Sequence, residues 1–116
     1  MDQEPSPVRA VQLCHDLLKW LVPQLDHFPR SRRFSLGARI ETTLLDVLSA
    51  LIAASYSRRK SNSLSSANQQ LAIVRHLWRL SLELKVIDQR RYQFGSERLL
   101  ELGSQIGGWQ KHAQNS

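Results

Sequence analysis

Residues 71–84, LAIVRHLWRLSLEL, decide the fold of this chain. At about 100° per residue, their apolar side chains cover more than half of the circumference of a helix. The remaining narrow polar arc carries Arg75, His76, Arg79 and Glu83. The pattern predicts a helix from about Leu64 or Ser65 to Lys85. So broad an apolar surface fits either the central helix of a monomeric bundle or a helix with one side against another subunit.

Three further helical patterns flank this stretch. Apolar spacings of three and four predict one helix from Pro7 to about Asp26, with a kink at Pro23, and a second from about Ser31 to Tyr56. A heptad-type seam from Tyr92 to Trp109 predicts the last helix, which opens at Asp88 as its N-cap. Four helices with short connections predict an all-α, antiparallel up-down four-helix bundle over residues 8–112, with tails at 1–7 and 113–116.

Two glycines lie on one face of the last predicted helix. Gly103 and Gly107 are four residues apart. Each lowers helix stability by roughly 1 kcal/mol relative to alanine. We expect a neighbouring helix to approach closely there and offset that cost.

The charge of the chain is positive and unevenly distributed. The formal net charge is +6 and the sequence pI is 10.3. Residues 1–28 hold two basic and four acidic residues, residues 29–60 seven and two, and residues 61–116 seven and four. A basic balance of this kind suggests a polyanionic partner such as nucleic acid, and the alternative is a solvated cationic surface.

Basic residues gather mainly at the predicted helix junctions. The candidate binding residues are Arg30, Arg32 and Arg33 at the first junction, Arg58, Arg59 and Lys60 at the second, Arg90 and Arg91 at the start of the last helix, and the i, i+4 pair Arg75 and Arg79. In an up-down bundle the first and third junctions share one end. Arginine clusters bind phosphates bidentately. No exposed aromatics are expected among them, so we expect charge-driven, salt-sensitive binding with little sequence preference.

Sequence patterns for catalysis, metals and cofactors are weak. The four histidines are scattered without metal-ligand spacing, and no glycine-rich loop has the context of a phosphate site. Arg9 and His15 have a spacing used by some four-helix-bundle ribonucleases, but they lie on the first helix rather than a late one. A bundle ribonuclease using this pair is therefore a minor alternative. We expect no cofactor.

The single cysteine and the hydropathy pattern indicate a cellular compartment. Cys14 has no intrachain partner and falls on an apolar stripe, which fits a reducing environment. The first residues are polar and acidic, unlike a signal peptide, and the longest uncharged run, 47–57, is too short to span a bilayer. We expect a soluble, cytoplasmic protein.

Four short motifs carry a family resemblance. They are Phe28-Pro-Arg-Ser-x-Arg-Phe-x-Leu-Gly, Lys60-Ser-Asn, Leu71-Ala-x-Val-Arg-x-x-Trp-Arg and Ile106-Gly-Gly-Trp109. In this order and spacing, from about Leu17 to Lys111, the chain resembles the accessory variability determinant (Avd) proteins of diversity-generating retroelements. It is also similar to a sister family, the four-helix-bundle proteins encoded in intervening sequences of bacterial 23S ribosomal RNA genes.

The Avd resemblance implies a fold, an assembly and a function. It implies a four-helix bundle that forms a barrel-shaped homopentamer with a basic surface and no catalytic activity of its own. Such proteins bind the retroelement's reverse transcriptase and its template RNA, and support mutagenic copying of the template. Arg75 and Arg79 fall where family members carry arginines implicated in these contacts. The basic first junction also matches the family, where helix capping and subunit packing are equally possible roles. The alternative resemblance implies a structural bundle with weak RNA affinity and no polymerase partner.

Overall fold

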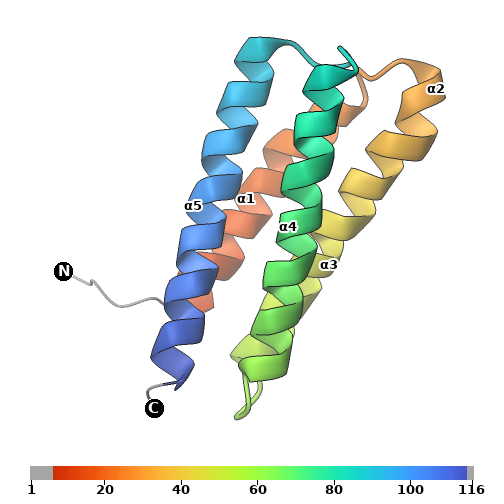
Figure 1. Ribbon diagram of the computed structural model, residues 1–116. Coiled ribbons are helices and arrows are strands. Elements are labelled where there is room, and N and C mark those ends of the chain that lie inside the picture. Colours follow the sequence, from red (N-terminus) through yellow and green to blue (C-terminus); the bar gives the residue numbers. More distant parts are fainter. Residues whose placement is uncertain (1–6, 115–116) are drawn as a thin grey trace.

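Four long helical stretches form the protein in the computed structural model, which describes residues 7–114 (Figure 1). They are α1 (Pro7–Leu25), the run of α2 (Arg30–Arg32), η1 (Arg33–Gly37) and α3 (Ala38–Ser55), then α4 (Ser61–Glu83) and α5 (Gln89–Gln114). No strand occurs among the described residues. The prediction of an all-α chain that forms a helical bundle is confirmed.

The helices pack around one core. α3 packs against α1 and α4, and α5 packs against α4 and α1. Figure 1 places the α1–α2 and α4–α5 junctions at one end of the molecule and the α3–α4 junction at the other. Below, these are called the double-junction end and the single-junction end. The basic clusters at the junctions are thereby divided between the two ends of the bundle.

The hydrophobic core contains the apolar stripes predicted from periodicity. Fully or nearly fully buried side chains occur at i, i+3 and i+4 spacings on α1, α3, α4 and α5, as on α3, where Ile40, Leu44, Val47 and Leu51 have no exposed surface. At about 25 cal/mol per Å² of apolar area removed from water, burial of these stripes is the main force that holds the helices together.

Aromatic packing joins three helices. Trp78 of α4 is almost fully buried, and its indole Nε1–H donates a 3.0 Å hydrogen bond to the carbonyl oxygen of Tyr92. Trp20 of α1 packs edge-on against Trp78 at 6.2 Å between ring centroids, and against Phe94 of α5 at 4.7 Å. This cluster fixes α1, α4 and α5 relative to one another.

Two of the helix ends differ from the predicted positions, and the start of α5 agrees with its prediction. α4 begins at Ser61, before the predicted start, because the polar residues of its first turn take helical geometry and Leu64 N–H bonds the Lys60 carbonyl at 2.9 Å. α5 begins at Gln89 with Asp88 as its cap, as predicted, since Arg91 N–H donates a 2.8 Å bond to Asp88 Oδ1. α5 continues to Gln114, beyond the end predicted at 112.

The second helical stretch starts with a turn that the periodicity did not indicate. Residues 33–37 form a π-helical turn, in which the Ala38 N–H bonds the carbonyl of Arg33. One extra residue in a helical turn shifts the face that later side chains present. Phe28, just before this stretch, is buried, whereas Phe34 inside the π turn is 72% exposed.

The glycine pair on α5 does not lie at a close helix approach within the subunit. A Cβ on Gly103 would meet only Leu71 at an ordinary 3.5 Å, and one on Gly107 would meet nothing within 4 Å. The close approach occurs instead at Gly95, which lies three residues after Tyr92 in the predicted seam and faces the ring of Trp78.

Candidate nucleic-acid and protein interface

The predicted pair Arg75 and Arg79 lies on an open groove between α4 and α5. One part of the groove, about 410 Å³, is lined by both arginines together with His76, Tyr92 and Leu100. It continues past Arg75, Ala72 and Leu100 into a second hollow of about 770 Å³, which is lined mainly by polar and small residues such as Asn68 and Ser104. A groove with arginines along its α4 side and apolar side chains along its α5 side can accept an extended chain that carries negative charge.

The two groove arginines differ in how they are paired. Arg79 contacts Glu83 at 3.6 Å, and both side chains are more than half exposed, so this pair adds little stability. Arg75 has no acidic partner among the residues that the structure describes. It is therefore the more available of the two for a partner's phosphate or carboxylate.

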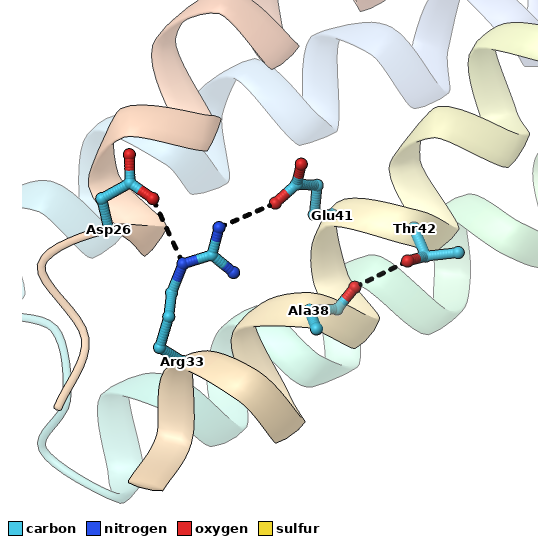
Figure 2. A network of polar contacts seen from close by, with 5 residues as sticks. All are labelled: Asp26, Arg33, Ala38, Glu41 and Thr42. Carbon is cyan, nitrogen blue, oxygen red and sulfur yellow. Dashed lines mark hydrogen bonds and ion pairs between the residues drawn. The ribbon is translucent and has the colours of Figure 1, made fainter. Parts of the chain in front are cut away.

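Arg33, by contrast, is held within the fold (Figure 2). Its Nε lies 3.2 Å from Asp26 at the end of α1, and its Nη2 lies 3.1 Å from Glu41 of α3. The side chain is mostly shielded from solvent. Two carboxylates that flank one guanidinium satisfy its charge, so this arginine ties the first junction to α3. Its neighbours Arg30 and Arg32 are exposed and have no acidic partner among the described residues.

Lys60 also has a structural position. Its ammonium group donates hydrogen bonds to the carbonyls of Ala54 at 2.9 Å and Ser57 at 2.6 Å, at the end of α3. A cation bonded to the last carbonyls of a helix stabilises that end. Arg58 and Arg59, in the same loop, are exposed and have no acidic partner among residues 7–114.

At the start of α5 the two arginines again separate in role. Arg91 lies 3.2 Å from Asp88 and takes part in the cap of the helix, whereas Arg90 is exposed and unpaired within the described chain. The double-junction end thus presents Arg30, Arg32 and Arg90 to solvent, with carboxylates nearby. The single-junction end presents Arg58 and Arg59.

One expectation about these clusters was wrong. No exposed aromatics were expected among the arginines, but Phe34 is 72% exposed and Tyr56 is 88% exposed. Phe34 follows Arg32 and Arg33 in the chain, and Tyr56 precedes Arg58 and Arg59. Both fall on the outward face of the second helical stretch, with Leu45 and Ile52. The helical period could have indicated this exposure, because these four residues fall on the side of the helix opposite the buried stripe of Leu44, Val47 and Leu51.

The geometry does not support the alternative of a bundle ribonuclease. Arg9 and His15 are six residues apart on α1, about 9 Å along the axis and about 120° around it. Among the described residues, no group of three or more His, Cys, Asp or Glu side chains could hold a metal ion.

Comparison with known protein families agrees with the sequence motifs. The family model described as bAvd-like matches residues 9–113, which is nearly the whole chain. The chain belongs to the bAvd-like family. No curated protein shows significant sequence similarity to this family member. None of its described helices is long and apolar enough to cross a lipid bilayer.

Proposed function

We propose that this bAvd-like chain is a non-enzymatic accessory protein of a diversity-generating retroelement. In this role it binds the element's reverse transcriptase and template RNA through its basic surface and supports mutagenic reverse transcription. The family match over residues 9–113 carries the proposal. It also favours this role over that of the 23S intervening-sequence proteins. A neighbouring reverse-transcriptase gene with template and variable repeats would support the same choice.

The exposed arginines support a polyanion as one partner. Six of the ten candidate side chains have neither an acidic partner nor a hydrogen bond in the described part of the chain; they are Arg30, Arg32, Arg58, Arg59, Arg75 and Arg90. Unpaired guanidinium groups on a rigid scaffold bind phosphate without first breaking an internal ion pair. In the proposed role, the groove that holds Arg75 and Arg79 is the main contact surface.

The proposal includes assembly of several copies, with a pentamer as the form that the family resemblance implies. The bundle topology in this proposal is antiparallel and up-down, which the division of the junctions between two ends supports. Apolar side chains left outside the core support a subunit contact. Leu45 and Ile52 on α3, Ile73 on α4 and Leu84 directly after α4 are each at least 40% exposed. Light scattering should give a native mass about five times the 13.3 kDa chain, and a monomer would contradict the assembly.

Charge reversal in the groove tests the binding role. Arg75→Glu with Arg79→Glu should abolish capture of the reverse transcriptase and of template RNA, because both arginines line one continuous surface. Circular dichroism should show an unchanged helical fold, since both side chains are exposed. The matched control, Arg39→Glu with Arg98→Glu, changes the net charge equally at other exposed positions. Unchanged binding in the groove variant, or equal loss in both variants, would contradict the assignment.

A further inference from the structure

The loop between α3 and α4 presents an aromatic ring beside two unpaired arginines. Tyr56, the residue directly after α3, is the most exposed large apolar side chain described, at 88%. Arg58 and Arg59 follow within three residues and are exposed without an acidic partner in the described chain. Single-stranded nucleic acid is bound by this combination, because bases stack on aromatic faces while cations hold the phosphates.

Hydrogen bonds hold the backbone of this loop in one shape. Lys60 Nζ binds the carbonyls of Ala54 and Ser57, and the Ser57 hydroxyl donates to the Arg59 carbonyl at 2.8 Å. The Tyr56 N–H also bonds the Ala53 carbonyl at 3.2 Å. A loop whose polar groups are satisfied internally loses little conformational entropy when a ligand binds its outward side chains.

A hollow of about 420 Å³ lies beside the loop. Arg58, Arg59 and Lys60 line it together with Leu64 and Trp109 of the core and His112 of α5. None of the described residues that line it is acidic. At the double-junction end, Arg33 and Arg91 are instead neutralised by Asp26, Glu41 and Asp88. The hollow at the single-junction end therefore lacks the lining carboxylates that would repel a polyanion.

We infer that Tyr56, Arg58 and Arg59 form a binding site for single-stranded RNA. An unpaired base stacks on the Tyr56 ring, and the two arginines hold the flanking phosphates. The inference deepens the proposed function and rests on its RNA-binding part. It adds a second contact region, at one end of the bundle, to the α4–α5 groove. Binding through charge alone would not distinguish unpaired bases from paired ones. Stacking on Tyr56 would make the protein prefer RNA with unpaired bases.

A second copy of the chain is the competing occupant of Tyr56. The ring lies on the same outward face as Leu45 and Ile52, which are 45% and 41% exposed. Three observations favour RNA: the ring lies beyond the last turn of α3, it is far more exposed than those two residues, and it precedes an unpaired arginine pair. An isologous interface between two copies, with the same patch on both sides, would place those like charges near each other.

Fluorescence anisotropy with three RNA probes of equal length tests the site. The probes are a single-stranded oligouridylate, an abasic ribose-phosphate oligomer of the same charge, and a duplex. Tyr56→Ala should weaken oligouridylate binding about tenfold, as expected for one lost stacking contact, and leave the abasic and duplex affinities unchanged. Tyr56→Phe should bind like the wild type. Arg58→Gln with Arg59→Gln should weaken all three probes and reduce the salt slope by about 1 to 2.

Ile52→Ala is the matched control, because Ile52 is an exposed residue of the same helix face without adjacent arginines. Equal affinity of Tyr56→Ala and wild type for oligouridylate would overturn the inference. Equal loss on the abasic probe, or a reduced native mass of the Tyr56 variant by light scattering, would also overturn it and assign the ring to packing or assembly. Failure of the wild type to bind any probe would instead refute the RNA-binding part of the proposed function itself.

Discussion

The backbone of α5 at Gly95 lies directly against the indole ring of Trp78 on α4. A Cβ atom at residue 95 would lie 2.7 Å from Cζ2 of Trp78, a distance at which one of the two groups has to move. The ring is almost fully buried, packs against Trp20 and Tyr92, and bonds the Tyr92 carbonyl, so it has little room to shift. This contact sets the separation of α4 and α5 beside the groove that holds Arg75 and Arg79.

Gly95→Ala should therefore destabilise the bundle. Overpacking a filled core costs about 1–3 kcal/mol. The better helix propensity of alanine returns about 1 kcal/mol. We expect a net loss of up to about 2 kcal/mol in the free energy of unfolding, measured by urea denaturation, and a change in near-ultraviolet circular dichroism from Trp78.

Gly107→Ala is the control for this substitution. Gly107 lies on the same helix, and a Cβ there would meet no other part of the subunit within 4 Å, so alanine should stabilise the subunit by up to about 1 kcal/mol. Similar stability changes in the two variants would contradict the role given to the Gly95–Trp78 contact. Loss of native mass on Gly107→Ala would place a partner subunit against that face.

Hydrophobic periodicity was sufficient to predict the helices and most of the core. It works because each helix here buries one stripe, as with Cys14, Leu18, Leu21 and Leu25 on α1. The same signal could not distinguish the two sides of the broad apolar arc on α4. Trp78 and Val74 lie inside the bundle, whereas Ile73 and Leu84 lie outside, because their positions depend on where α3 and α5 pack.

The candidate site was predicted less completely, because the sequence does not show which cations form ion pairs or hydrogen bonds within the fold. Sequence clusters identify cations but not their partners. Arg33 and Lys60 stood in clusters with equivalent neighbours, yet Arg33 lies between two carboxylates and Lys60 bonds the end of α3. The residues that meet them come from other parts of the chain or from backbone carbonyls, which a charge pattern does not show. The exposure of Tyr56 likewise depends on which face of α3 the core covers.

Lys85 offers a second test of backbone geometry. It closes α4 with a φ of 60°, the one non-glycine residue with positive φ among those described. The Val86 N–H bonds the Ser81 carbonyl at 3.0 Å, and the Lys85 N–H bonds the Leu82 carbonyl at 2.9 Å, which is the Schellman pattern that glycine favours.

Lys85→Gly should raise the free energy of unfolding by about 1 kcal/mol, because glycine has no Cβ and adopts the left-handed conformation without steric strain. Lys85→Ala keeps a Cβ and should give no such gain in thermal or urea denaturation; a gain equal to that of glycine would refute the strain argument.

Replacement of Arg33 should separate stability from binding. Arg33→Gln removes the charge that joins Asp26 and Glu41 and leaves two carboxylates at the junction. The contacts are partly exposed, so we expect a loss of about 1 kcal/mol in the free energy of unfolding, smaller at high salt. RNA affinity should change less than in Arg32→Gln, whose guanidinium is exposed and unpaired in the described chain. A larger effect of Arg33→Gln on RNA binding than of Arg32→Gln, at equal fold content, would show that the ion pairs open for a ligand.

Burial of Cys14 gives the protein an alkaline dependence of stability. The thiol has no exposed surface in the core between α1 and α3, its Sγ lies 4.0 Å from the Leu44 carbonyl, and burial raises its pKa from 9.0 to about 12. In the unfolded chain the thiol ionises near pH 9, whereas the folded state keeps its proton. The contribution to stability is therefore complete below pH 9 and is lost as the pH rises toward 12, by at most about 1.4 kcal/mol per pH unit.

Urea denaturation of the wild type and of Cys14→Ala tests this dependence. The difference between their free energies of unfolding should be constant below pH 9 and should shrink above it, because the contributions of the other titrating groups cancel. Iodoacetamide at pH 8 should modify the thiol only after unfolding; curves that stay parallel to pH 10.5, or rapid alkylation of the folded protein, would show that the thiol ionises in place.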